Sequence, residues 1–196
     1  MATYDPATAL AVVDVQNDFA DPAGSLYVAG GEDVVAAAND QIERALAADA
    51  VVVYTQDWHP PSTPHFAKDG GVWPVHCVRD TWGAAFHPLL RVVDGAPVVR
   101  KGVGGEDGYS GFTVADPATG ERSVTELAKI LRDRGVTRLI VAGLATDYCV
   151  KDTAIDGAKL GFATVVLAGA TRAVDLKHGD GAAALDAMRA AGVAIA

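Results

Sequence analysis

Six short apolar runs rich in β-branched residues alternate along the chain with segments of helical periodicity. The runs cover residues 9–13, 51–55, 97–99, 139–142, 164–167 and 193–195. Each is almost continuously apolar, which is typical of strands buried on both faces, as in parallel sheets. The pattern therefore predicts an α/β fold with a doubly wound, mostly parallel six-stranded sheet and helices on both faces, in a single domain over residues 1–196.

Helical patterns fill several gaps between the predicted strands. Apolar residues recur at three- and four-residue steps at positions 35, 38, 42 and 46 and would share one helix face. Ser123 and Glu126 form a capping-box pattern that predicts another helix start. A further helix is expected from Cys149 to the glycine at position 161.

Charge and hydropathy exclude some classes of partner. The net charge is −9, and no cluster of Lys and Arg is present, which argues against nucleic-acid binding. No apolar run approaches the ~20 residues that a membrane-spanning helix needs. The first six residues lack a basic region followed by an apolar segment, so we expect no signal peptide and a cytoplasmic protein with reduced thiols.

Three reactive side chains follow predicted strands. Asp14 follows the first strand, Lys101 the third and Cys149 the fourth. Because ligands bind beyond the carboxyl ends of parallel strands, we expect the three to converge there. A thiol nucleophile, a carboxylate proton acceptor and an organising ammonium suit nucleophilic catalysis, and the unpaired N–H groups at a helix start favour a thiolate. The alternatives are a small buried cysteine, a loop-capping carboxylate and a solvated lysine.

Histidines and a carboxylate gather after the second predicted strand. Asp57 and His59 are two residues apart, and His65 and His76 follow within twenty residues in an irregular stretch. Imidazoles and a carboxylate with open positions suit a divalent transition metal such as Zn, Fe or Mn, whereas a lone loop histidine is commonly a polar surface residue. Cys77 would point away from His76 on an extended backbone, so we expect it in the core.

Five segments resemble the nicotinamidase/pyrazinamidase branch of the isochorismatase-like cysteine hydrolases and occur in that family's order. They are Val13–Phe19, Gln56–Pro60, Trp73–Val78, Arg100–Gly102 and Gly143–Val150. The resemblance implies hydrolysis of nicotinamide, and of pyrazinamide, to the acid and ammonia through a cysteine thioester. It also implies one bound divalent metal ion and no organic cofactor.

The resemblance assigns roles to individual residues. It implies a catalytic triad of Asp14, Lys101 and Cys149. It implies metal ligands at Asp57, His59 and His76, with His65 at a position where only some relatives have an additional ligand. It implies a cis peptide bond between Leu144 and Ala145, and an oxyanion hole formed by the N–H groups of Ala145 and Cys149. It implies substrate contacts from Phe19, Trp73, Tyr109 and Ala145.

Other functions are compatible with parts of this pattern. An amidase of the same superfamily that acts on a carbamoyl or ureido compound would keep the triad but need no metal. A catalytically silent ligand-binding protein would gain nothing from a reactive thiol. Relatives are variously monomers and homo-oligomers, so the sequence is also compatible with a homo-oligomer.

Overall fold

Six parallel strands form the main sheet of the computed structural model, which describes residues 3–196. The strand order is β3-β2-β1-β6-β7-β8, and every neighbouring pair is parallel. The strands are β1 (Thr8–Val13), β2 (Val51–Asp57), β3 (Val98–Lys101), β6 (Arg138–Leu144), β7 (Ala163–Arg172) and β8 (Ala194–Ile195). The predicted α/β fold is confirmed.

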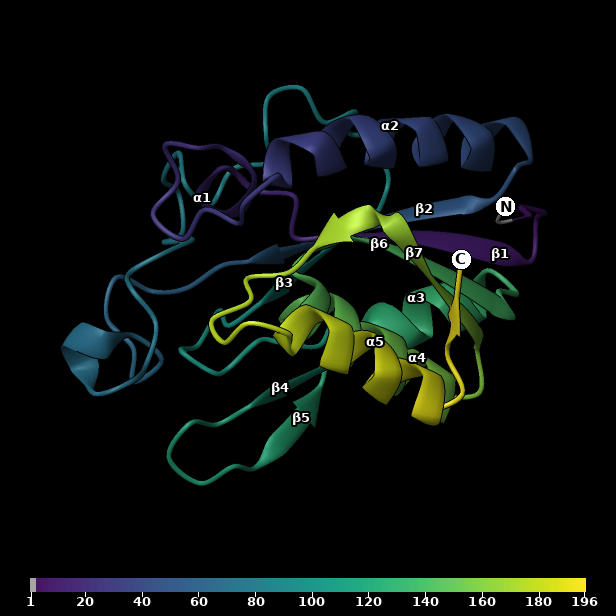
Figure 1. The fold of residues 1–196 in the computed structure, drawn as a ribbon. Helices are drawn as coiled ribbons and strands as arrows, with labels where there is room; N and C mark the ends of the chain where they lie inside the picture. The colour runs from purple at the N-terminus through teal and green to yellow at the C-terminus, as the bar shows by residue number, and fades with distance from the viewer. Residues whose placement is uncertain (1–2) are drawn as a thin grey trace.

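Helices cover both faces of this sheet (Figure 1). One face carries α2 (Gly31–Ala47), and the other carries α3 (Leu127–Asp133), α4 (Lys151–Lys159) and α5 (Asp180–Ala190). The shorter elements are α1 (Asn17–Ala20), a 3₁₀ turn at Ala67–Asp69 and a π-helical turn at Thr146–Val150 that leads directly into α4. A hairpin of β4 (Thr113–Ala115) and β5 (Arg122–Val124), which the sequence pattern did not predict, projects from the side of α3–α5 (Figure 1).

The alternation of side chains along β1 divides the hydrophobic core into two layers. Leu10 and Val12 share a buried cluster with Ile42 of α2. Ala11 belongs to the opposite cluster, together with Leu131 of α3. Because successive strand residues point to opposite faces, a strand covered on both sides must be apolar throughout, and all six residues of β1 are buried.

The sheet has its topological switch point between β1 and β6. The chain adds β2 and β3 on one side of β1, and β7 and β8 on the other side of β6. Ligands of open α/β sheets bind beyond the carboxyl ends of the strands at such a point. The residues that follow β1 and β6 therefore lie where a site is expected.

The Gln16 side chain continues the hydrogen bonding between β1 and β2 after the main chain has turned away. The turn begins at Asp14, which has a left-handed φ of 49°. Oε1 of Gln16 accepts a hydrogen bond from the N–H of Asp57, and Nε2 donates to the carbonyl oxygen of Asp57, both at 2.8 Å. A buried side-chain amide thus fixes the main chain of Asp57 at the end of β2.

One predicted helix start is wrong in detail. Ser123 lies in β5 and not in a capping box. The hydroxyl of Thr125 instead accepts a hydrogen bond from the N–H of Leu127, the first residue of α3, at 3.2 Å. Pairing of Ser123 with β4 therefore overrides the local helix signal.

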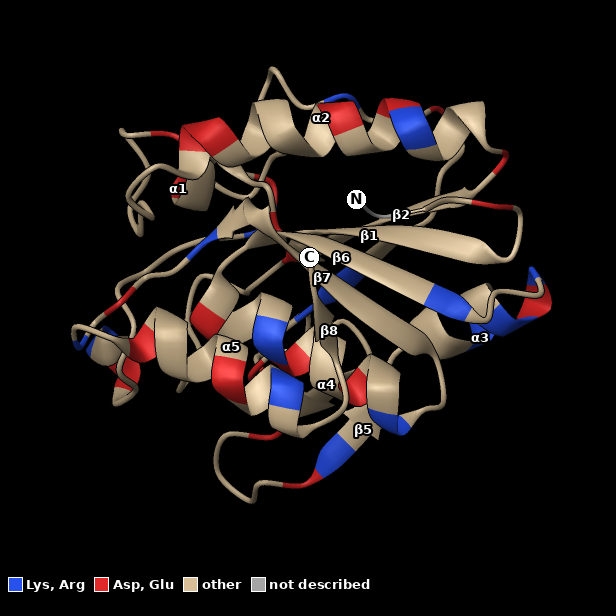
Figure 2. Cartoon of the chain, turned by 45° about the vertical axis from the view of Figure 1, so that its right-hand side comes forward, with Lys and Arg blue, Asp and Glu red and all other residues tan. Residues whose placement is uncertain are grey.

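Within residues 3–196, the helices are all too short or too polar to cross a membrane. Acidic and basic residues are interspersed along α2, α4 and α5 (Figure 2).

Candidate active site

Three strands deliver Asp14, Lys101 and Cys149, which we call the triad, to one end of the sheet. Asp14 follows β1, Lys101 is the last residue of β3, and Cys149 lies in the π-helical turn after β6. β1 and β6 are neighbours, whereas β2 separates β1 from β3. A residue on β3 therefore needs a long side chain to reach Asp14, and the Lys101 side chain spans this distance fully buried.

The Lys101 ammonium holds the triad together. Its Nζ lies 2.6 Å from Oδ2 of Asp14 and 3.5 Å from Sγ of Cys149. The other carboxylate oxygen of Asp14, Oδ1, accepts a hydrogen bond of 2.6 Å from the Thr55 hydroxyl. Asp14 is thereby fixed on both oxygens, within 4.8 Å of the thiol.

Burial governs the protonation of the triad. It raises the pKa of Cys149 well above the usual range, and the Lys101 ammonium offsets only part of this. It also raises the pKa of Asp14, again against the opposing effect of Lys101. Burial alone would lower the pKa of Lys101, but the Asp14 and Asp57 carboxylates raise it well above the usual range. Because its pKa is raised, the Cys149 thiol needs a proton acceptor beside it before it can act as a nucleophile.

Ala145 links β6 to the turn that carries Cys149. The peptide bond between Leu144 and Ala145 is cis, as the resemblance implies. The Ala145 carbonyl oxygen accepts hydrogen bonds from the N–H groups of Tyr148 and Val150 at 3.1 and 3.0 Å. Ala145 and Cys149 line the same cavity, and the oxyanion-hole role of their N–H groups stays a prediction.

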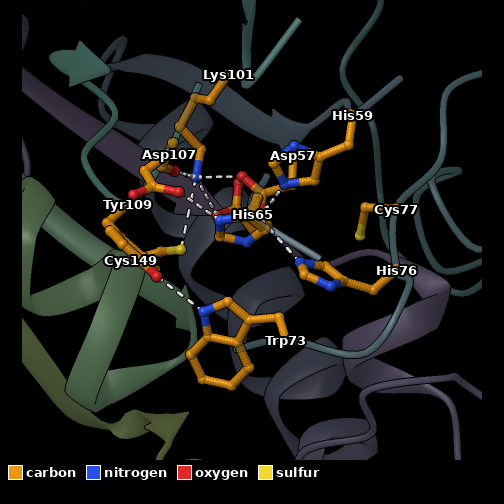
Figure 3. A network of polar contacts seen from close by, with 12 residues as sticks. Asp57, His59, His65, Trp73, His76, Cys77, Lys101, Asp107, Tyr109 and Cys149 are labelled. Carbon is orange, nitrogen blue, oxygen red and sulfur yellow. Dashed lines mark hydrogen bonds and ion pairs between the residues drawn. The ribbon is translucent and has the colours of Figure 1, made fainter. Parts of the chain in front are cut away.

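The three histidines His59, His65 and His76, which we call the histidine cluster, converge beside the triad. One ligand atom from each lies within 4.8 Å of the others, and their side chains gather around one centre (Figure 3). Oδ2 of Asp57 lies 3.8 Å from Nε2 of His59 and 3.9 Å from Nε2 of His76. The structure thus brings the three predicted histidine ligands together, including His65, with the predicted ligand Asp57 beside His59 and His76.

Hydrogen bonds behind two of the rings orient their ligand nitrogens. Nδ1 of His76 lies 2.8 Å from the Pro74 carbonyl oxygen, and Nδ1 of His65 lies 2.6 Å from Oδ1 of Asp107. Because these oxygens accept, each Nδ1 carries the hydrogen and each Nε2 presents a lone pair. Both ring nitrogens of His59 are buried without a hydrogen-bond partner among residues 3–196. A metal ion fits this donor set, because it would satisfy nitrogens that are otherwise costly to bury.

The protonation states of the cluster also suit a metal. Burial lowers the pKa of His76 to about 4 and lowers that of His65. Burial alone would raise the pKa of Asp57, but the Lys101 ammonium holds it below the usual range. Neutral imidazoles and an ionised carboxylate are the forms that bind a divalent cation.

Asp57 joins the triad to the histidine cluster. Its Oδ1 lies 2.9 Å from Nζ of Lys101, and its Oδ2 faces the histidines. Any change at this carboxylate therefore acts on both groups, whereas Gln16 fixes its main chain from outside either group.

A cavity opens between the triad and the cluster. Its walls include the predicted substrate contacts Phe19, Trp73 and Tyr109. Nε1 of Trp73 donates a hydrogen bond of 2.7 Å to the Tyr109 hydroxyl, and Tyr148 meets the Trp73 ring edge-on at 4.8 Å. The aromatic and apolar walls of the cavity, with a few polar groups, suit a planar ligand. A larger surface hollow between β5, α3 and α4 is lined by residues outside the triad and the cluster.

Three consecutive residues each support a different part of this site. Asp107 bonds to the histidine cluster, as described above. The Gly108 carbonyl oxygen accepts a hydrogen bond from Lys101, and the Tyr109 hydroxyl accepts the one from Trp73. A Cβ at Gly108 would lie 2.7 Å from Cβ of Lys101, so only glycine fits this close approach.

Comparison with known proteins places the chain in a family. Residues 8–196 match the isochorismatase domain model. The chain belongs to the isochorismatase family. The nicotinamidase of Escherichia coli (strain K12) is 38% identical over 206 residues, which cover 97% of this chain and 94% of that protein.

Two solved structures related to this isochorismatase-family chain carry bound groups. Pyrazinamidase of Pyrococcus horikoshii in complex with zinc has a TM-score of 0.86 and 38% identity, with 97% of this chain and 99% of that chain covered. PnC1 from L. infantum in complex with nicotinate has a TM-score of 0.88 and 36% identity, with 100% and 95% covered. The family and its fold are thus shown over almost the full chain.

Sequence reasoning missed several residues of this isochorismatase-family site. Thr55 lies two residues before Asp57 in β2 and so shares its face, a signal that the strand pattern contained. Tyr148 directly precedes the predicted nucleophile. Asp107, Leu26 and Val174 carry no local signal, because their roles depend on contacts with distant segments.

Proposed function

We propose that the chain is a nicotinamidase, which hydrolyses nicotinamide, and by the same chemistry pyrazinamide, to the acid and ammonia. The observation that carries this proposal is that the triad and the histidine cluster open into one aromatic-lined cavity and share Asp57. A planar ring between Phe19 and Trp73 would place its carboxamide near Cys149. The nicotinamidase relative, and the relatives in complex with zinc and nicotinate, support this assignment.

The first half-reaction forms a thioester. Asp14 accepts the Cys149 proton as Sγ bonds to the carboxamide carbon, and the carbonyl electron pair moves onto oxygen. The N–H groups of Ala145 and Cys149 donate hydrogen bonds to that oxygen; loss of one such donor typically costs about 10²–10³ in turnover. When the tetrahedral adduct collapses, the C–N bond breaks, Asp14 returns the proton to nitrogen, and ammonia leaves.

The second half-reaction releases the acid. Asp14 accepts a proton from a water molecule as the water oxygen bonds to the thioester carbon. The C–S bond then breaks and Sγ recovers the proton from Asp14, which restores the thiol. Throughout, the Lys101 ammonium keeps the carboxylate and the sulfur in contact and offsets negative charge in a buried site.

The histidine cluster and Asp57 are proposed to hold one divalent transition metal ion, for which Zn, Fe and Mn are all suitable. When bound, such an ion supplies a Lewis-acid position for a ring nitrogen or a water molecule. His59 contributes because its buried nitrogens need a partner, and His65 and His76 contribute because their Nε2 atoms are already oriented.

The alternative is an amidase that acts on a carbamoyl or ureido compound. Such an enzyme would use the triad in the same way, but it would have no need for a buried cluster of oriented histidines. A silent ligand-binding protein would not need a buried cation that joins a thiol to a carboxylate.

We also propose that the protein acts in the cytoplasm.

The deciding experiment measures ammonia release from nicotinamide by the metal-loaded protein. We expect Cys149→Ala to abolish release and Cys77→Ala, which removes the other buried thiol, to retain it. Quenching during turnover and peptide mass spectrometry should find the nicotinoyl group on Cys149. Release from a ureido substrate but not from nicotinamide would replace this proposal by the alternative, and equal release by Cys149→Ala would remove the nucleophile.

A further inference from the structure

The three histidines of the cluster differ in what holds their rings. His76 is held by the carbonyl oxygen of Pro74, two residues away in the same loop. The His59 ring lies against Gly102, where a Cβ would come within 2.6 Å of its Nδ1. His65 is the one held by a side chain from a distant segment, through the Asp107 bond of 2.6 Å across 42 residues.

The bond between His65 and Asp107 determines which nitrogen faces the cluster. The imidazole is 4% exposed and the carboxylate 29%, so the bond runs from the buried site to its outer wall. Because a carboxylate accepts, Nδ1 carries the hydrogen and Nε2 is left with its lone pair towards the other histidines. Without this acceptor, the ring is free to take the other tautomer or to turn.

Asp107 is fixed independently of His65. Its N–H donates to the Ala115 carbonyl oxygen at 2.8 Å, and its carbonyl oxygen accepts from the Ala115 N–H at 2.9 Å. Ala115 is the last residue of β4, so the β4–β5 hairpin holds this segment in place. The carboxylate is therefore already in position when His65 meets it.

The orientation of His65 also affects a second ligand. The rings of His59 and His65 are stacked, with centroids 4.6 Å apart and an interplanar angle of 21°. A turned His65 ring would displace the stacked face of His59, whose ring nitrogens have no hydrogen-bond partner among residues 3–196. Two members of the cluster thus depend on one carboxylate.

We propose that Asp107 is a positioning residue that acts through His65 to prepare the histidine cluster for its metal ion. This inference rests on the metal site of the proposed function and adds to it a residue outside the ligand set. Outer hydrogen-bond partners of metal-bound histidines typically contribute about 10–100-fold to metal affinity, and we expect an effect of that size.

The test measures the Zn²⁺ dissociation constant of the metal-free protein by competition with a chromophoric chelator. We expect Asp107→Ala to weaken binding about 10–100-fold, and Asp107→Asn to weaken it less, because a neutral amide oxygen still accepts a hydrogen bond. Asp152→Ala is the matched control, since Asp152 and Asp107 both line a second surface hollow, beside β4, but Asp152 pairs with Lys151. It should bind as the wild type does.

A double-mutant cycle separates the route through His65 from a general structural effect. We expect Asp107→Ala to add nothing to the loss caused by His65→Ala. Equal affinity of wild type and Asp107→Ala would overturn the inference and leave the metal site intact, and so would additive losses in the double variant. Failure of the wild type itself to bind Zn²⁺ would overturn the metal site and this inference together.

Discussion

The triad and the histidine cluster share one cavity, but different kinds of structure build them. The triad comes from the ends of β1 and β3 and from the turn after β6, all set by the sheet. His65 and His76 come from the long connection between β2 and β3, whose one helical element is a three-residue 3₁₀ turn. The position of the triad thus follows from topology, whereas the position of the cluster depends on individual hydrogen bonds.

The segment after β1 supplies several of those bonds. Oδ2 of Asp18 accepts a hydrogen bond from the N–H of Cys77 at 2.7 Å, directly after His76. The Cys77 carbonyl oxygen in turn accepts from the N–H of His59 at 3.0 Å. A loop with little repetitive structure is therefore ordered by side chains of a neighbouring segment, and single substitutions can disorder it.

The largest expected effect breaks the triad and spares the cluster. Asp14→Asn removes the proton acceptor while keeping the shape of the side chain, and kcat for nicotinamide should fall about 10²–10⁴-fold. Metal content should not change, because the hydrogen-bond partners of the Asp14 carboxylate are Lys101 and Thr55 rather than the histidines. Steady-state kinetics and elemental analysis check this, with Asp40→Asn on α2 as the control. Loss of metal in Asp14→Asn would show that the two groups are not separable.

The next effect breaks the cluster. His59→Ala removes a proposed metal ligand itself. Metal affinity should therefore fall further than it does on loss of a hydrogen-bond partner behind a ligand, which typically costs about 10–100-fold. The Lys101 ion pair with Asp14 does not involve His59, so the fold and the triad should persist. Chelator competition and circular dichroism test this, with the exposed His178→Ala as the matched control. Unchanged affinity would remove His59 from the metal site.

The smallest effect tests the hydrogen bond between Trp73 and Tyr109 in the wall of the cavity. Tyr109→Phe removes the hydroxyl that accepts the hydrogen bond from Trp73. Such a bond typically contributes a net free energy of about 0.5–1.5 kcal/mol to holding its two partners in place. We expect KM for nicotinamide to rise about 2–10-fold with kcat nearly kept. Tyr4→Phe, which removes a hydrogen bond to Gln41 of α2, serves as the control. A fall in kcat at constant KM would mean that Tyr109 acts on the reacting atoms instead.

The same contrast explains how much the sequence could predict. Continuous apolar runs identified all six strands of the main sheet, and their expected parallel arrangement predicted that Asp14, Lys101 and Cys149 meet at one end of it. The β4–β5 hairpin escaped prediction because its three-residue strands are partly or fully exposed and carry no buried pattern. Asp107 was not predicted because its partner His65 is 42 residues away, and a contact between such distant residues gives no periodic pattern in the sequence.

The thiol illustrates a different limit of sequence reasoning. A helix start suggested a thiolate at Cys149, yet burial raises the pKa of this thiol and the nearby Lys101 ammonium offsets only part of the shift. Charge at a site depends on how much water the fold removes, which no local pattern records.

The amide of Gln16 has one more consequence. The side-chain amide offers a donor and an acceptor on one planar group, so it can take the place of a peptide unit. The ladder of hydrogen bonds to β2 therefore continues beyond the last residue of β1. The main chain can thus leave the sheet at Asp14, while the neighbouring strand β2 keeps its hydrogen bonds up to Asp57. Gln16→Glu would replace the NH₂ group by an oxygen, which would face the carbonyl oxygen of Asp57, another acceptor. The substitution would thus displace Asp57, whose carboxylate contacts both the triad and the histidine cluster.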